Sequence, residues 1–362
     1  MSTKYTMIFV IIVVTLFIGT VVLLTYSDNQ IVLLNGSGAG FPYPLLDGMI
    51  TQYSYIRPNV QINYQATGSG AGISALTDKI VDFACSDAPL SASEAEKAPN
   101  ALHIPETIGS IAIAYNINGI PTGLKLTSQV VADIFQGKIT KWNDSAITNL
   151  NPDVTLPAAN INVIRRSDSS GTTFIFTGYL SAISPSWKSN IGQAKSVDWP
   201  VGSGQSGNTG VASIVISTPN AIGYVELAYA LQNDMTFAAI QNPSGNYILP
   251  SLTSTTAAAQ AVATSGLPAG HENWSNVNLL NANAPNAYPI VGFSYLLVYK
   301  ELNVIPGMTQ ESATELVEFL WHIVHDGQSI ASGLDYAPLP SNVVEINATT
   351  IKSITFNGVT VL

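Results

Sequence analysis

The sequence predicts an α/β fold of two domains that follows an apolar N-terminal segment. Short runs rich in β-branched residues alternate with segments of helical periodicity, and this alternation is typical of the α/β class. The chain has 362 residues, enough for two domains at roughly 100–200 residues each. Hydrophobic residues make up 46% of the chain and charged residues only 10%, so intrinsic disorder is excluded.

The charge balance argues against a nucleic-acid partner. The chain holds 13 Lys and Arg against 23 Asp and Glu, which gives a formal net charge of −10. Such a chain lacks the basic patches that neutralise nucleic-acid phosphates. Cys85 is the single cysteine, which excludes a disulfide framework and a thiolate-rich metal site. We expect it to be a small buried core residue.

Residues 1–30 are predicted to form a membrane anchor or a signal segment. No charged residue occurs in residues 5–27, and this run reaches the ~20 residues that a transmembrane helix needs. Lys4 precedes the run, and the next basic residue is Arg57. The positive-inside bias therefore puts the amino end in the cytoplasm and the folded part at the extracellular face of the membrane. A cleaved signal, with a shorter apolar region of about 7–15 residues, is the alternative, and the protein would then be secreted or periplasmic.

The exported part begins with predicted strands and ends with a predicted helix. Residues 31–34 form a buried-type strand, and apolar residues alternate with polar ones in residues 60–64. Further strands are predicted at residues 111–115 and 161–164. Residues 312–325 carry Leu and Phe at helical spacing, and residues 242–286 are interpreted as surface helix and loop.

Three glycine- or serine-rich turns follow strands and lead into segments that can begin a helix. The first two, GSGAG at residues 36–40 and GSGAG at 68–72, repeat each other, and SSGT at 169–172 is the third. Such turns present unpaired backbone N–H groups and a positive dipole end to an anion. None fits the G-x-G-x-x-G or Walker patterns, so a nucleotide site is disfavoured. Arg165 and Arg166 directly precede the third turn, and these features together predict an oxyanion pocket.

Histidine chemistry is not indicated. His322 and His325 lie three residues apart near the end of the predicted helix, where the helix dipole already favours a positive side chain. No metal and no cofactor are therefore expected. His103 is interpreted as a surface or domain-edge residue.

Seven stretches of the chain resemble the phosphate-binding proteins that feed high-affinity phosphate ABC transporters, and they occur in the family's order over nearly all of the chain after Gln30. They are residues 38–42 (GAGFP), 64–65 with 68–69, 82–83 with 86–90 (SDAPL), 137–139 with 141–142, 165–172 (RRSDSSGT), 221–226 (AIGYVE) and 334–340 (LDYAPLP).

The resemblance implies a two-domain clamp of periplasmic-binding-protein type with the ligand in the interdomain cleft. One α/β domain would combine residues 31–107 with 290–362, and the other would be residues 108–289. The hinge strands would lie near residues 106–108 and 289–291, and the domains would close around the ligand by a hinge motion. The resemblance further implies a monomeric, non-enzymatic solute-binding protein that delivers inorganic phosphate to the permease subunits of an ABC transporter.

The family's binding residues carry over motif by motif. In the first loop, Gly40 stands where the family has a hydroxyl, so Phe41 can supply its N–H but the hydroxyl is missing. The remaining expected phosphate-binding residues are Ser69, Asp87, Arg166, Ser170, Gly171 and Thr172, with Asp168 as the acid that pairs with the arginine.

Asp87 is the residue expected to select phosphate. Monohydrogen phosphate offers a P–OH donor, whereas sulfate at neutral pH offers acceptors only. An ionised carboxylate can only accept hydrogen bonds, so it matches the P–OH and repels sulfate. Sites built on hydrogen-bond matching discriminate by roughly 10⁴–10⁵ when the partner proton is absent.

Two alternatives stay open at this point. The same pocket could serve a phosphoesterase, which would need a nucleophile with a base, and no histidine lies within the three loop motifs. The missing hydroxyl at Gly40 also leaves room for a receptor of another tetrahedral oxyanion.

Overall fold

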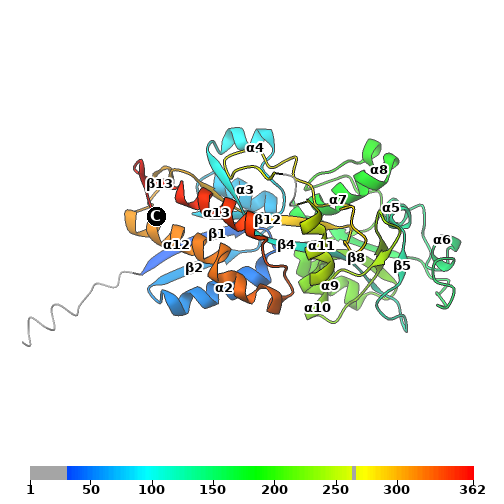
Figure 1. The fold of residues 1–362 in the computed structure, drawn as a ribbon. Helices are drawn as coiled ribbons and strands as arrows, with labels where there is room; N and C mark the ends of the chain where they lie inside the picture. Colours follow the sequence, from blue (N-terminus) through cyan, green and yellow to red (C-terminus); the bar gives the residue numbers. More distant parts are fainter. Residues whose placement is uncertain (1–30, 263–265) are drawn as a thin grey trace, which may run out of the picture.

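A computed structural model describes residues 31–262 and 266–362 (Figure 1). The predicted anchor or signal segment, residues 1–30, lies outside the described residues. Among the residues that the structure does describe, no helix is both long enough and apolar enough to span a bilayer.

The core of the fold is a nine-stranded mixed sheet in the order β2-β1-β3-β12-β4-β8-β6-β7, with β9 paired to β4. Its strands are β1 (Val32–Gly38), β2 (Val60–Gln65), β3 (Phe83–Ser86), β4 (Ala101–Asn116), β6 (Asn162–Arg166), β7 (Ser203–Gln205), β8 (Ala221–Glu226), β9 (Thr236–Phe237) and β12 (Val291–Tyr299). β1 pairs in parallel with β2 and β3, and β6 pairs in parallel with β7 and β8.

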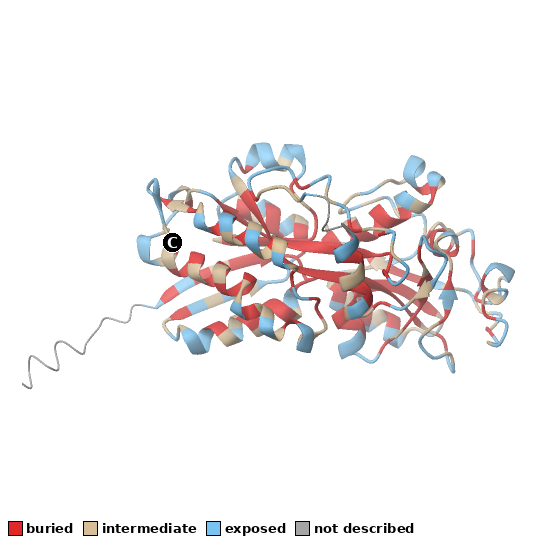
Figure 2. Ribbon diagram, viewed as in Figure 1, coloured by how far each residue is buried: buried red, intermediate tan, exposed pale blue. Residues whose placement is uncertain are grey.

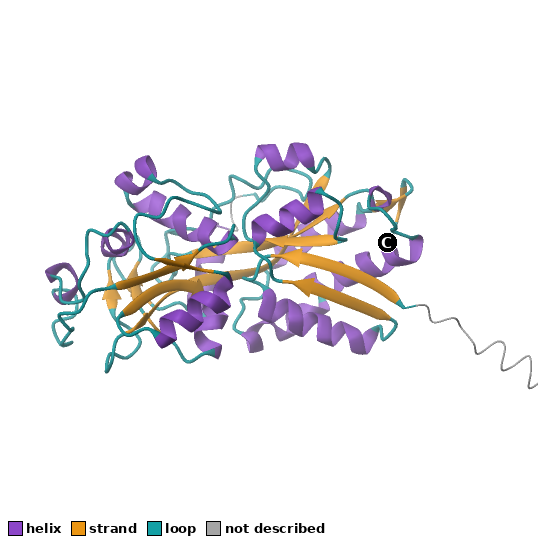
Figure 3. Ribbon diagram, turned by 180° about the vertical axis from the view of Figure 1, so that it is seen from behind, coloured by secondary structure: helices purple, strands orange, loops and turns teal. Residues whose placement is uncertain are grey.

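One long strand joins the two halves of this sheet. Residues 101–110 of β4 pair antiparallel with β12, whereas residues 111–116 pair antiparallel with β8. The half-sheet of β1, β2, β3 and β12 and the half-sheet of β6, β7, β8 and β9 therefore lie end to end along the molecule (Figure 3). The chain passes from the first half to the second along β4 and returns through β12.

Helices cover both half-sheets. They are α2 (Tyr43–Ile56), α3 (Ser69–Thr77), α4 (Ala92–Lys97), α5 (Ser128–Phe135), α6 (Ser145–Thr148), α7 (Gly171–Ile183), α8 (Pro185–Asn190), α9 (Gly207–Ser217), α10 (Leu227–Gln232), α11 (Leu252–Val262), α12 (Gln310–Val324) and α13 (Ser341–Lys352), with two 3₁₀ helices, η1 (Leu302–Val304) and η2 (Asp326–Leu334). α3 packs on β1 and β3, and α9 packs on β6 and β8. Figure 2 shows the consequence: the central strands are buried, and the helices turn exposed faces outward.

Short strands complete the described part. β5 (Lys125–Leu126), β10 (Ala239–Gln241) and β11 (Tyr247–Ile248) form a small sheet, and β13 (Thr355–Phe356) pairs with β14 (Val359–Thr360).

The predicted α/β class is confirmed, and each of the predicted strands coincides with an observed one. The strand predicted at residues 31–34 continues to Gly38, so three of the five residues of the first glycine motif are strand and the turn begins only at Ala39. The strand predicted at residues 111–115 is the second half of the much longer β4. The predicted helix at 312–325 is α12. Cys85 is fully buried, as expected.

Gly72 is the point where α3 touches the end of β1. A Cβ atom at this position would overlap the Gly38 Cα and would lie 2.7 Å from the Ser37 carbonyl oxygen. Both are backbone atoms, so the strand end itself would have to move. Because β1 ends in the first glycine turn and α3 begins in the second, this contact sets the distance between the two turns.

We expect Gly72→Ala to destabilise the fold. Alanine favours a helix by about 1 kcal/mol relative to glycine, but the overlap with rigid backbone costs about 1–3 kcal/mol. Gly333→Ala, at an exposed position where a Cβ meets no atom within 4 Å, is the matched control and should leave stability nearly unchanged. Urea unfolding monitored by circular dichroism measures both. A urea midpoint for Gly72→Ala equal to that of the parent chain would show that the end of β1 accommodates a Cβ atom without loss of stability.

Candidate functional site

The three glycine- and serine-rich turns converge at the junction of the two half-sheets. The Gly68 N–H donates to the Gly38 carbonyl at 2.8 Å, and the Gly70 N–H donates to the Ser169 carbonyl at 2.9 Å. Gly68 has a φ of +98°, a value that L side chains rarely adopt. The turn at Gly68 therefore links the first turn to the third, although the two belong to opposite half-sheets.

α7 directs its N-terminus into this junction. The Ser170 hydroxyl caps the helix by accepting from the Thr173 N–H at 3.1 Å. The amides of Gly171 and Thr172 are in the first helical turn, where no intrahelical acceptor exists. They add a positive dipole end to the site. The backbone of Ser170 is held by a further hydrogen bond, in which its N–H donates to the Lys195 carbonyl at 2.9 Å.

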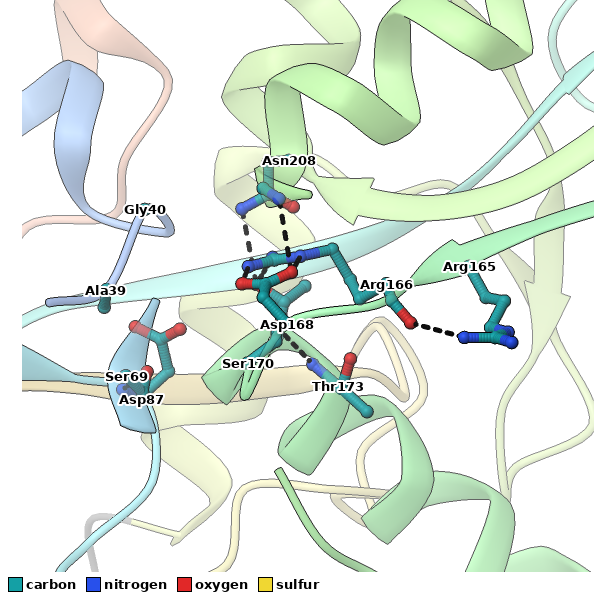
Figure 4. A network of polar contacts seen from close by, with 12 residues as sticks. Ala39, Gly40, Ser69, Asp87, Arg165, Arg166, Asp168, Ser170, Thr173 and Asn208 are labelled. Carbon is teal, nitrogen blue, oxygen red and sulfur yellow. Dashed lines mark hydrogen bonds and ion pairs between the residues drawn. The ribbon is translucent and has the colours of Figure 1, made fainter. Parts of the chain in front are cut away.

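Arg166 lies at the end of β6 and is held by Asp168. The guanidinium donates through Nε to Asp168 Oδ1 at 2.7 Å and through Nη2 to Asp168 Oδ2, a two-point contact that fixes its plane (Figure 4). Nη1 reaches the Thr172 hydroxyl at 3.3 Å. Only 3% of Arg166 is exposed. Burial raises the pKa of Asp168, but the hydrogen bonds and charge of Arg166 outweigh it and hold that pKa below its ordinary value.

Asp87 faces this pair from the other half-sheet. Figure 4 shows Asp87 and Ser69 beside the turn at Ala39 and Gly40, across from Arg166. The Asp87 N–H donates to the Ser69 hydroxyl oxygen at 3.2 Å, and the Ser294 hydroxyl lies 2.9 Å from Asp87 Oδ1. Burial raises the pKa of Asp87 to about 7, while the hydrogen bond to Ser294 and the charge of Arg166 act to lower it.

The predicted residues meet at Gly171. A Cβ there would touch the Ser69 hydroxyl and would lie 2.5 Å from Asp87 Oδ2, so only glycine allows this approach. Ser69, Asp87 and Gly171 are thus brought into direct contact, and Arg166, Asp168, Ser170 and Thr172 surround them. The turn at Gly40 and Phe41 completes the ring, with both carbonyls held by tyrosines: Tyr229 donates to the Gly40 carbonyl at 2.6 Å and Tyr336 to the Phe41 carbonyl at 2.7 Å.

Four groups beside the site were not predicted as functional residues. They are Ser294, Glu106, Glu226 and Tyr336. Glu226 is fully buried, and burial raises its pKa well above the ordinary value. Glu106 is also buried, and burial raises its pKa to about 8. A sequence signal existed for Ser294, which interrupts the otherwise apolar β12, whereas Glu106 lies among other polar residues of β4 such as His103 and Thr107.

His103 was interpreted as a surface or domain-edge residue, and the surface position is wrong. The side chain is 5% exposed, and its Nε2 accepts from the Leu90 N–H at 3.0 Å. Burial lowers the pKa of His103 to about 4, so the ring is neutral and supports the loop after Asp87. In residues 31–262 and 266–362, no group of three or more His, Cys, Asp or Glu side chains is arranged to hold a metal ion.

Comparison with known proteins identifies the family. A family model described as PBP superfamily domain matches residues 25–321, which places the chain in the PBP superfamily of solute-binding proteins. The phosphate-binding protein PstS of Xylella fastidiosa is 42% identical over 325 residues, covering 88% of this chain and 85% of the relative. PstS of Methanocaldococcus jannaschii is 37% identical over 348 residues, covering 91% and 88%. The chain belongs to this PstS family.

Solved structures share the fold. The high-affinity periplasmic phosphate-binding protein PfluDING, solved with phosphate, aligns with a TM-score of 0.70 at 22% identity, covering 87% of this chain and 92% of that one. A putative phosphate ABC transporter substrate-binding protein from Clostridium perfringens, with bound phosphate, aligns with a TM-score of 0.61 at 16% identity, covering 85% and 100%.

We expect the ligand-free protein to lose stability as the pH rises from about 4 to 7. Asp87 and Glu106 have raised pKa values, so in this window the folded chain holds protons that the unfolded chain has released. The free energy of unfolding then falls by about 1.4 kcal/mol per pH unit for each such group. Asp87→Asn removes one of them and should make the slope shallower by up to that amount.

Urea unfolding at pH 4.5, 5.5 and 6.5, on protein stripped of bound ligand by unfolding and refolding, measures this slope. Asp47→Asn is the control, because Asp47 is exposed on α2 and its removal should keep the parent slope. Equal slopes for Asp87→Asn and Asp47→Asn would rule out a buried, proton-binding Asp87.

Proposed function

We propose that this protein captures inorganic phosphate outside the cytoplasm and delivers it to the permease of an ABC transporter, without chemical turnover. One observation carries the proposal: a buried carboxylate, Asp87, faces a buried and oriented guanidinium, Arg166, across three converging backbone turns. The family membership and the names of the PstS relatives support the same ligand.

Each group has a role that phosphate chemistry requires. Arg166 and the amides of Phe41, Gly171 and Thr172 donate to the phosphate oxygens, as do the hydroxyls of Ser69, Ser170 and Thr172. Asp168 orients Arg166. Ionised Asp87 accepts from the P–OH group, and a fully ionised sulfate has no proton to offer it. Gly40 contributes no hydroxyl, so the first turn binds through backbone alone.

The proposed clamp has its domains at residues 31–107 with 290–362 and at residues 108–289. β4 and β12 support this division, because the chain crosses between the half-sheets along them. Contacts between the two proposed domains support closure around the ligand. Lys195 Nζ lies 2.7 Å from Glu94 Oε1, and the Tyr229 hydroxyl donates to the Gly40 carbonyl. We propose that the functional unit is a monomer.

An enzymatic role would need a base beside the pocket. His103 is the histidine nearest to Asp87 in sequence, and its Nε2 is already occupied by the Leu90 N–H. Its depressed pKa and burial favour a supporting role. We therefore prefer binding over phosphoester hydrolysis, and lack of turnover of an aryl phosphate would agree with this choice.

Substitution of Asp87 and Arg166 should separate selectivity from affinity. Asp87→Asn should weaken discrimination against sulfate by at least about tenfold, because the amide can donate where the carboxylate only accepts. Arg166→Ala should weaken binding of every tetrahedral oxyanion by about 2–5 kcal/mol. Titration calorimetry of the full chain with phosphate, arsenate and sulfate measures both effects.

Arg165→Ala is the matched control, because it removes the same charge from the neighbouring residue. The Arg165 side chain points away from Asp168 and donates to the Arg166 carbonyl at 3.2 Å (Figure 4). Its phosphate affinity should stay near that of the parent chain. No phosphate heat in the parent chain would refute the proposed function, and unaltered selectivity in Asp87→Asn would refute the role of Asp87.

Residues 5–27 are proposed as an uncleaved anchor that keeps the binding domains at the outer face of the cytoplasmic membrane. The full chain should sediment with membranes after a high-salt wash and should be digested by protease added outside. A chain that starts at residue 31 should be soluble. Recovery of the mature protein in the soluble fraction, with a new N-terminus after residue 20, would instead support a cleaved signal.

A further inference from the structure

A short chain of buried oxygen atoms leads away from the phosphate side of Asp87. The Ser294 Oγ lies 2.9 Å from Asp87 Oδ1 and 3.0 Å from Glu106 Oε1. Ser294 is fully buried, and Glu106 is 2% exposed. Water therefore cannot replace either contact. Cys85 also hydrogen-bonds Glu106, and Ser69 hydrogen-bonds Asp87, but among the described residues only the Ser294 hydroxyl connects the two acids.

A bulge in β4 creates this contact. Ser294 pairs with Thr107, but the next residue of β12, Tyr295, pairs with Pro105. Glu106 is the extra residue between them, and such bulges re-aim side chains next to binding sites. The bulge brings the Glu106 carboxyl to the hydroxyl of Ser294, directly behind Asp87.

The protons of this chain can be counted. A serine hydroxyl donates one hydrogen bond, and an ionised carboxylate donates none. If both acids were ionised, the single Ser294 proton could serve only one of the two carboxylates. The Ser294 oxygen would then face the other carboxylate oxygen with no hydrogen between them, which is strongly unfavourable in a buried place. At least one of the two carboxyls must therefore carry a proton.

The surroundings decide which acid is protonated. Asp87 is attracted by the charge of Arg166, and that attraction favours its ionised form. Glu106 has no cation beside it, and burial and the nearby negative charge of Asp87 favour its protonated form. The titratable groups that face the two acids are Cys85 from β3, Tyr64 from β2, Tyr295 from β12, Arg166 from β6, Glu226 from β8, Tyr229 from α10 and Tyr336 after η2.

We infer that Glu106 is a positioning residue for phosphate recognition. Its protonated carboxyl donates to Ser294, Ser294 donates to Asp87 Oδ1, and Asp87 is kept ionised so that Oδ2 can accept from the ligand's P–OH. The inference rests on the proposed function and adds to it a residue that never touches phosphate. Ionisation of Glu106 at high pH would remove the donor and add a second negative charge behind Asp87, so phosphate affinity would fall.

Glu106→Gln tests the inference, because glutamine imitates the protonated acid. Its amide N–H can donate to Ser294 at every pH. Phosphate affinity of the full chain is measured by calorimetry from pH 6.5 to 9.5. The ionisation of phosphate itself affects variant and parent equally, so it cancels when the two dissociation constants are compared at the same pH. The variant should match the parent near pH 7 and should bind more tightly above about pH 8, by a factor that approaches about tenfold per pH unit.

Glu315→Gln is the matched control. Glu315 is another buried glutamate, on α12, and it contacts the Tyr53 hydroxyl rather than the site. It should keep the parent pH profile. A Glu106→Gln profile identical to the parent would overturn the inference while leaving phosphate binding established, whereas absence of phosphate binding in the parent would overturn both proposals.

Two further measurements cover a variant that does not fold. Glu226 also has a raised pKa, so the infrared measurement uses Glu226→Gln: its spectrum at pH 7 should still contain the carbonyl stretching band of a protonated carboxylic acid, lost on titration to pH 9.5, and a spectrum without that band would overturn the inference. Ser294→Ala should weaken phosphate binding at pH 7 by roughly tenfold to a hundredfold, because Asp87 loses its donor. Unchanged affinity in Ser294→Ala would also overturn it.

Discussion

The pairing of Arg166 with Asp168 is the interaction on which the rest of the site depends. It places a buried guanidinium in one plane at the N-terminus of α7. The pair is neutral as a unit, and the chain has a net charge of −10, so long-range attraction cannot bring an anion to the site. The attraction has to be local, from the free edge of Arg166 and from the backbone amides of Phe41 and the first turn of α7.

This scarcity of positive charge limits how many of the buried acids near the site can be ionised at once. Burial raises the pKa of Asp87, Glu106 and Glu226, and only Asp87 has the charge of Arg166 to oppose that effect; Glu106 and Glu226 face the negative charge of Asp87 instead. Were all three ionised, a single arginine could not balance them. Protonation of Glu106 and Glu226 removes this conflict. A protonated Glu106 can donate to Ser294, and Glu226 Oε2 accepts from the Tyr336 hydroxyl at 3.1 Å without carrying a charge.

The sequence was sufficient for the parts of the site that are local and repeated. The turns at residues 68–72 and 169–172 precede or open helices, as their composition predicts. The groups behind the site could not be predicted, because Ser294 is 207 residues from Asp87 and 188 from Glu106. Their contact depends on the antiparallel pairing of β12 with β4 and on a one-residue bulge, and no local pattern specifies either. The error on His103 has the same origin. His103 is a residue of β4 whose neighbours include β12, and that long-range pairing cannot be seen in the local sequence.

Recognition of phosphate against sulfate depends on where one proton lies. Dihydrogen phosphate with ionised Asp87 and monohydrogen phosphate with protonated Asp87 hold the same number of protons, so phosphate fits the site in either form. Sulfate brings no proton, and it fits only when Asp87 is itself protonated and donates. Ser294 lowers the pKa of Asp87 from behind the site, so it opposes sulfate at a given pH without touching it. Selectivity is in this sense a property of the buried hydrogen bonds behind Asp87 as much as of the residues that surround the ligand.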